Sequence, residues 1–129
     1  MNDIKLIAEN GEYIIFYIDE EFFKYGKSEI EIKVSNYHVR GLVWFSFGEL
    51  SKFAKELKLM YEKMKGNVVL VDSECNVDIT FSLNQRGYFV LKGRYKENLA
   101  KDNELIFELE TTQPSINRWV TKLNEAIKR

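Results

Sequence analysis

Acidic side chains gather in the middle of the chain, where Asp72, Glu74 and Asp78 are close in the sequence. Carboxylates at such spacing could hold a divalent cation or work as an acid–base pair. The ligand spacing of an EF-hand is absent, however, and the turns between strands often carry acidic residues simply because they are solvated. We therefore predict neither a metal site nor a catalytic carboxylate pair at this point.

The other reactive side chains are also isolated. His38 is the only histidine, follows Tyr37 at the end of an expected strand, and is predicted to be a surface or turn residue. Cys75 is the only cysteine, so it has no intramolecular disulfide partner, and its acidic neighbours disfavour a nucleophilic thiolate. Glycine-rich phosphate loops and the sequence motifs of serine hydrolases and zinc proteases are missing. The sequence therefore predicts no enzyme, no catalytic residue and no cofactor.

One stretch, QRGYFVLK at residues 85–92, is similar to an RNA-recognition strand. Arg86, Gly87 and Tyr88 match the first three positions of that motif. Phe89 stands where a small residue is needed, and the shift moves every later side chain to the opposite sheet face. We interpret the stretch as a turn at Gly87 followed by a core strand, which argues against a nucleic-acid partner.

The composition is that of a folded domain with a charged surface. Of the 129 residues, 45% are hydrophobic and 30% charged, with 19 basic against 20 acidic residues. Nucleic-acid domains usually carry a clear basic excess, which this chain lacks. The N-terminal residues do not have the pattern of a signal peptide, and no apolar stretch approaches the roughly 20 residues of a membrane span. We expect one domain over residues 1–129 in the reducing cytoplasm, away from membranes.

Hydrophobic periodicity divides the chain into two strand-rich halves, each followed by an amphipathic helix. Residues 28–34 alternate, with Ile30, Ile32 and Val34 on one face, and the next strand contains Gly41, where we expect a bulge or bend. Residues 19–21 and 25–27 are predicted to form a loop. The Ser46-x-x-Glu49 capping box predicts the first helix at about 47–65, and Pro114 the second at about 114–128.

These elements predict an α+β fold. About seven to eight strands would form a strongly bent, mainly antiparallel sheet, either curled like a barrel or stacked like a sandwich. The two helices would pack on it.

Surface recognition remains as a function, because acidic patches on a rigid scaffold suit a basic protein partner. The candidate partner-binding residues, each of which could equally be an ordinary solvated side chain, are Asp19, Glu20, Glu21, Asp72, Glu74, Glu108 and Glu110. The basic side of the first helix is the corresponding candidate for nucleic acid, and it carries Lys52, Lys55, Lys58 and Lys63.

A series of motifs runs along most of the chain. Its residues are Gly41, Val43 and Phe45; Phe53, Leu57 and Tyr61 in a helix; Val77–Phe81; Gly87, Tyr88, Val90 and Gly93; Leu105, Phe107 and Leu109; Thr112 and Gln113; and Leu123. In their order and pattern, these motifs resemble those of the WapI-type immunity proteins, small bacterial proteins encoded beside toxins that are delivered by cell contact.

This resemblance implies a non-enzymatic inhibitor that binds the toxic domain of a cognate toxin, often a nuclease, inside the bacterial cell. A net charge of −1 is less acidic than inhibitors of basic nucleases usually are, so recognition would depend on shape and local patches. The alternative is a small cytoplasmic domain that binds a ligand or nucleic acid. The oligomeric state stays open.

Overall fold

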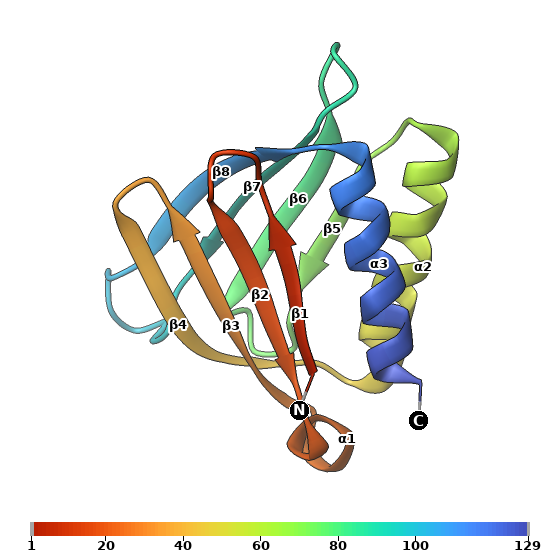
Figure 1. Cartoon of the computed structure of the whole chain (residues 1–129). Coiled ribbons are helices and arrows are strands. Elements are labelled where there is room, and N and C mark those ends of the chain that lie inside the picture. The colour runs from red at the N-terminus through yellow and green to blue at the C-terminus, as the bar shows by residue number, and fades with distance from the viewer. Residues whose placement is uncertain (1, 129) are drawn as a thin grey trace.

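The computed structural model describes residues 2–128, and these form eight strands and three helices (Figure 1). Strands β1 to β4 make one antiparallel sheet, sheet A, and β5 to β8 make a second, sheet B, each in sequence order. The elements are β1 Asn2–Ile7, β2 Tyr13–Ile18, α1 Glu20–Tyr25, β3 Lys27–Val34, β4 Tyr37–Trp44, α2 Phe47–Lys63, β5 Val68–Val71, β6 Val77–Leu83, β7 Phe89–Tyr95, β8 Leu105–Thr111 and α3 Gln113–Ile127.

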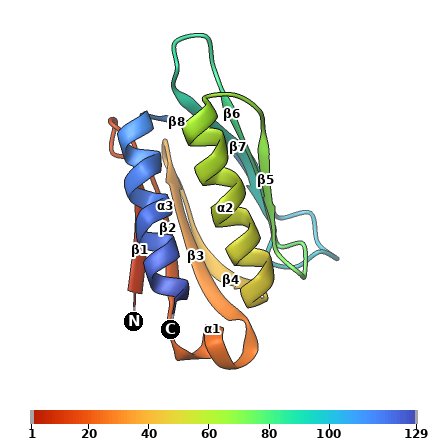
Figure 2. The same cartoon turned by 90° about the vertical axis from the view of Figure 1, so that its right-hand side faces the viewer.

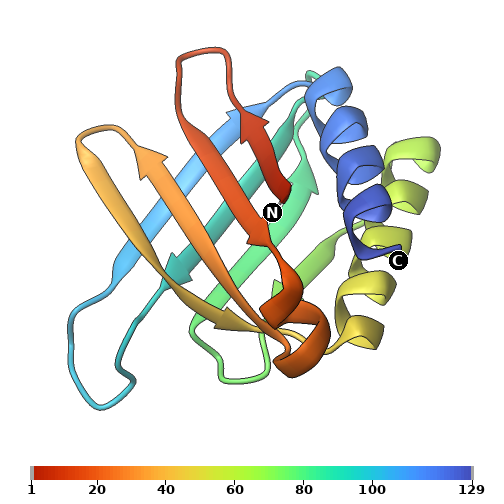
Figure 3. The same ribbon diagram turned by 60° about the horizontal axis from the view of Figure 1, so that its bottom comes forward.

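The two sheets face each other, and the strands of one cross those of the other (Figure 3). Helices α2 and α3 lie side by side along one flank, where α3 packs against β1 and α2 against β5 (Figure 2). The predicted α+β class with antiparallel strands and two amphipathic helices is confirmed. Within residues 2–128 the sheets do not close into a barrel, so the sandwich-like alternative describes them better.

The core is built from the inner faces of both sheets. Ile30 and Ile32 are completely buried, as the alternation in β3 predicts. Trp119 of α3 lies at the centre and contacts the rings of Phe16 and Phe81, one from each sheet. Its indole Nε1–H donates a hydrogen bond of 3.2 Å to the carbonyl oxygen of Ile4. Helix α3 therefore joins sheet A to sheet B.

The long helices begin where the capping signals predict. The Ser46 side chain accepts from the Glu49 amide at 3.0 Å, and the Glu49 carboxylate accepts from the Ser46 amide at 2.8 Å. Helix α2 ends at Lys63, slightly earlier than expected, because Met64 adopts a left-handed conformation with φ of 53°. Helix α3 is capped by Thr112 and has Pro114 in its first turn.

A short helix, α1, stands where the sequence predicted a loop. The Asp19 side chain caps it by accepting from the Glu21 amide at 2.9 Å, and Gly26 ends it with φ of 74°. Phe22 turns inward and is only 3% exposed. A helix of six residues is too short to show a hydrophobic period, so the sequence pattern did not reveal it.

Of the bulge or bend expected at Gly41, the bulge is wrong. Strand β4 pairs with β3 without interruption, with Gly41 opposite Ile30. The glycine is required for another reason: a Cβ atom there would lie 2.1 Å from the hydroxyl of Tyr95 in sheet B. That hydroxyl donates to the carbonyl oxygen of Leu42 at 2.9 Å. Gly41 thus lets the two sheets approach where β4 meets β7.

The QRGYFVLK stretch is a turn and a core strand, as predicted. Gly87 has φ of 82°, and Phe89 and Leu91 are completely buried. Tyr88 lies on the other side with the Arg86 guanidinium 5.3 Å from its ring centre. The βαββαβ order of an RNA-recognition domain is not the order of these elements.

Candidate functional site

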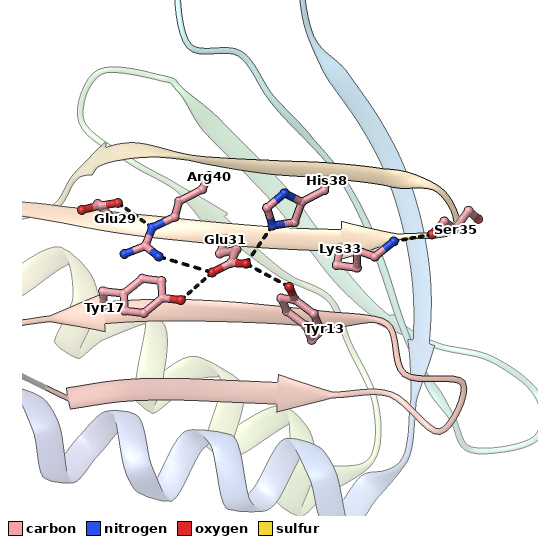
Figure 4. A network of polar contacts seen from close by, with 8 residues as sticks. All are labelled: Tyr13, Tyr17, Glu29, Glu31, Lys33, Ser35, His38 and Arg40. Carbon is pink, nitrogen blue, oxygen red and sulfur yellow. Dashed lines mark hydrogen bonds and ion pairs between the residues drawn. The ribbon is translucent and has the colours of Figure 1, made fainter.

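The most organised polar cluster lies on the outer face of sheet A. Alternate residues of a strand share a face, and the strand register brings Glu31 of β3 opposite Ile15 of β2 and Arg40 of β4. We call the cluster the Glu31 network, and it comprises Tyr13, Tyr17, Glu29, Glu31, His38 and Arg40 (Figure 4).

Both oxygens of the Glu31 carboxylate are engaged. The hydroxyl of Tyr17 donates to Oε1 at 2.5 Å, and that of Tyr13 donates to Oε2 at 2.9 Å. His38 Nε2 lies 2.7 Å from Oε2. The Glu31 side chain is only 13% exposed, although the face on which it lies is open to solvent. Surrounding side chains therefore shield a carboxylate at the centre of an exposed sheet face.

Arg40 completes the network on one side. Its Nε donates to Glu29 Oε2 at 2.8 Å, and its Nη1 lies 3.7 Å from Glu31 Oε1. The guanidinium carbon lies 4.2 Å from the ring centre of Tyr17, which is a cation–π geometry. Arg40 is thereby fixed by three different side chains.

These contacts set the protonation states. The hydrogen bond from the Tyr17 hydroxyl, followed by that from His38, lowers the pKa of Glu31 to about 2 against the opposing effect of burial. The same bond raises the pKa of Tyr17 to about 12, and the bond to Glu31 also raises the pKa of Tyr13. At neutral pH the network therefore holds an ionised carboxylate between two neutral phenols.

The network is better suited to recognition than to proton transfer, because a carboxyl group with such a low pKa is a poor general acid or base at neutral pH. Tyrosine and arginine are the residue types enriched at the energetic centres of protein interfaces. Here their conformations are already fixed by internal contacts, which reduces the entropy lost on binding. Among the described residues there is no group of three or more His, Cys, Asp or Glu side chains placed to hold a metal ion.

A second feature is an aromatic pocket at the end of the molecule where α1 lies, with a volume of about 720 Å³. Its walls come from α1, from the junction of β4 and α2, from the turn between β5 and β6, and from the end of α3. The lining residues are Phe22, Phe23, Tyr25, Gly26, Trp44, Phe45, Ser46, Phe47, Ser73, Glu74 and Ile127.

The fold brings several of the predicted acidic residues to this end. Glu20 and Glu21 are exposed on α1 and form ion pairs with Lys24 at 3.8 Å and with Lys27 at 3.2 Å. Glu74, from the β5–β6 turn, is exposed and lines the aromatic pocket. Residues far apart in the sequence thus lie around one surface.

Asp72 is different from the other acidic candidates because it is buried, with an exposed fraction of 2%. Its Oδ2 accepts from the Trp44 amide at 3.0 Å, and its Oδ1 accepts from the Val77 amide at 3.0 Å. A carboxylate held in this way cannot present itself to a partner, so Asp72 has a structural role and leaves the set of surface candidates.

Glu108 and Glu110 lie elsewhere, on the outer face of sheet B. Glu108 forms an ion pair with Lys92 at 3.4 Å, and Glu110 forms one with Arg86 at 3.5 Å. All four side chains of these pairs are well exposed. The outer face of sheet B therefore carries paired charges of both signs, without a shielded centre.

The single histidine and the single cysteine both lie at the surface. His38 is exposed, as predicted, but its contact with Glu31 could not be foreseen without the strand register. Cys75 is an exposed free thiol in the β5–β6 turn with φ of 59°.

No helix among residues 2–128 has the length and apolar character needed to cross a membrane.

Comparison with known proteins identifies one family. A family model described as the immunity protein WapI-like family matches residues 5–129, nearly the whole chain. No curated protein matches. Among solved structures, a chain from the crystal structures of Trypanosoma brucei MRP1/MRP2 is similar with a TM-score of 0.58 and 12% identity, covering 97% of this chain and 81% of that chain. At this identity the likeness shows a shared fold alone.

Proposed function

This chain belongs to the WapI-like immunity protein family, and we propose from this premise that it is a bacterial inhibitor that acts in the cytoplasm. It would bind the toxic domain of a cognate contact-delivered toxin, such as a nuclease, and neutralise it without catalysing a reaction. The family match over residues 5–129 is the observation that carries the proposal.

The surface of the structure supports binding as the mode of action. A groove of about 320 Å³ lies next to α1, and Tyr17 and Arg40 of the Glu31 network line it together with Asp19 and Glu21. Helix α1 therefore lies between the Glu31 network and the aromatic pocket. We propose that the toxin contacts this continuous surface, with Asp19, Glu20, Glu21 and Glu74 supplying its negative charge. Glu108 and Glu110 on the mixed-charge face of sheet B are the alternative contact residues.

The test is an affinity purification of the tagged chain from its own cells, with the retained proteins identified by mass. The expected result is equimolar recovery of the C-terminal domain of a large secreted protein. Co-expression of that domain in a heterologous bacterium should stop growth, and expression of this chain should restore it.

Two results would contradict the proposal. One is the recovery of nucleic acid in place of a protein, which would favour a nucleic-acid-binding domain. The other is the recovery of no partner from cells shown to produce the toxin.

A further inference from the structure

We propose that the aromatic pocket receives a lysine or arginine side chain that projects from the partner protein. This inference rests on the proposed function for the identity of the partner, but its chemistry can be tested without it. The pocket would contribute specificity by pairing one basic side chain with aromatic rings and a carboxylate.

The rings around the pocket are exposed to an unusual degree. Tyr25 is 72% exposed and Phe47 is 56% exposed, while Trp44 in the same lining is half-buried. Large apolar side chains that border one open cavity, with polar groups at its rim, are typical of interaction sites. The faces of such rings also attract cations, most strongly in the case of tryptophan.

The charge of the pocket selects the occupant. Among the described residues that line it, Glu74 is the only one with a charged side chain. Behind it, the hydroxyl of Ser73 donates to the Glu49 carboxylate at 2.8 Å. The Ser46 amide and the Ser73 hydroxyl lower the pKa of Glu49, so that this second carboxylate is also ionised. An anionic side chain would be repelled here, and an apolar one would bury Glu74 without a partner.

The helix ends do not oppose this preference. The capping box of Ser46 and Glu49 satisfies amides at the N-terminus of α2, and the Glu49 carboxylate offsets the partial positive charge at that end. The C-terminal end of α3 reaches the pocket through Ile127, and its partial negative charge is followed in the chain by the cationic Lys128, the C-cap residue. Glu74 therefore sets the preference for a cation.

The pocket is held in shape by backbone hydrogen bonds between its walls. The Phe45 amide donates to the Gly26 carbonyl oxygen at 2.8 Å, and the Ser73 amide donates to that of Trp44 at 2.7 Å. The buried Asp72 carboxylate also accepts a hydrogen bond from the Trp44 amide. Three segments that are distant in the sequence are thus fixed before any partner arrives, which lowers the entropy cost of binding.

The first experiment titrates the ¹⁵N-labelled chain with N-acetyl-arginine amide and, separately, with its neutral isostere N-acetyl-citrulline amide, and follows the two-dimensional NMR spectrum. Arginine should shift the Trp44 indole signal and the amides of Tyr25 and Phe47, and citrulline should bind at least about threefold more weakly, as expected for a cation–π contact plus an exposed ion pair. Glu74→Gln should reduce the difference between the two probes, because the ion pair is lost and only the cation–π contribution remains.

A matched control is Glu62→Gln, which removes an exposed carboxylate from the solvent face of α2. This variant should leave the preference for arginine unchanged. Equal shifts from both probes, or shifts from arginine that lie away from the pocket, would overturn the proposal.

The second experiment uses the toxin domain recovered by affinity purification. Glu74→Lys and Phe47→Ser change exposed side chains, so they should fold normally, and each should weaken the complex about tenfold or more, as at the centre of an interface. The control Glu62→Lys should have no such effect. A complex that tolerates both pocket variants would reject the pocket while leaving the proposed function intact.

The remaining outcomes are also decisive. If no toxin complex forms, the proposed function is wrong. The arginine titration then remains as the test of whether the pocket binds a basic side chain. Sedimentation of the free chain tests a second copy as occupant: a dimer that Phe47→Ser abolishes would show that the pocket serves self-association, contrary to the proposal.

Discussion

Sheets A and B have the same number of strands and the same antiparallel order, but their outer faces are organised differently. In sheet A, the Glu31 carboxylate accepts hydrogen bonds from two tyrosines, and its side chain is 13% exposed. In sheet B, Lys92 and Glu108 are directly opposite each other and are 68% and 62% exposed. One face has a shielded ionic centre with several partners, and the other has separate ion pairs in water.

The difference shows what aromatic neighbours do for a polar sheet surface. Cross-strand pairing places opposite charges together in both sheets, yet an exposed pair gains little because water competes for each charge. The phenol rings of sheet A exclude part of that water and also donate hydrogen bonds to the charge. Sheet A therefore has a polar patch fixed by several contacts, whereas the ion pairs of sheet B are exposed to water.

The largest expected effect comes from the shielded carboxylate. Glu31→Gln removes the charged acceptor of three side chains and should lower the free energy of unfolding by about 2 kcal/mol. Glu108→Gln in sheet B should change it by less than about 0.5 kcal/mol. Urea unfolding followed by circular dichroism measures both. Equal losses for the two variants would remove the distinction between the sheets.

The next effect is a dependence on pH. The pKa of Glu31 is about 2 in the folded chain and near its ordinary value of 4.5 in the unfolded chain, so the unfolded chain takes up this proton first. The stabilisation is complete above pH 4.5 and is lost as the pH falls towards 2. The stability difference between the unmodified chain and Glu31→Gln should therefore narrow over this range. A constant difference would show that the charge of Glu31 contributes nothing.

A smaller effect is expected from a single phenol. Tyr17→Phe keeps the ring that shields Glu31 but removes the hydroxyl. It should lower the free energy of unfolding by about 1 kcal/mol. Tyr37→Phe removes a hydroxyl from a 63% exposed residue of the same sheet and should cost almost nothing. Both values come from the same unfolding assay. A similar loss of stability in the two variants would show that the Tyr17 ring, and not its hydrogen bond to Glu31, stabilises the network.

The smallest effect concerns salt. Lys92→Gln should alter the free energy of unfolding by less than about 0.5 kcal/mol, and this difference should vanish in 1 M salt because exposed pairs are screened. The effect of Glu31→Gln should persist at the same ionic strength. Parallel urea titrations at low and high sodium chloride measure both effects. An equal response of the two variants to salt would contradict the difference between the two sheets.

The sequence predicted the elements whose signals are local. The alternation around Ile30 and Ile32 and the capping box at Ser46 each lie within one element, so they could be recognised without knowledge of the fold. The short helix α1 was missed because six residues are too few to show a helical period. Gly41 was misinterpreted because its reason, the Tyr95 hydroxyl, lies in the other sheet.

The candidate site was harder to predict because it depends on register. Glu31 meets Arg40 and His38 only when the β3–β4 hairpin turns at Ser35 and Asn36, and it meets Tyr13 and Tyr17 only through the pairing with β2. Acidic residues could be identified as candidates, but burial could not, which is why Asp72 was included with them. The grouping of Glu20, Glu21 and Glu74 at one end follows from the fold alone.

Trp119 has a consequence for how the protein is made. It fills the centre of the core and reaches the Ile4 carbonyl, yet α3 follows all eight strands in the sequence. While the ribosome is still translating the strands, both sheets lack this ring and their inner faces stay incompletely covered. The chain must therefore complete its folding after α3 has left the exit tunnel. The core of each molecule should therefore be completed at a single late step, and a chain interrupted before α3 should be a substrate for chaperones and proteases.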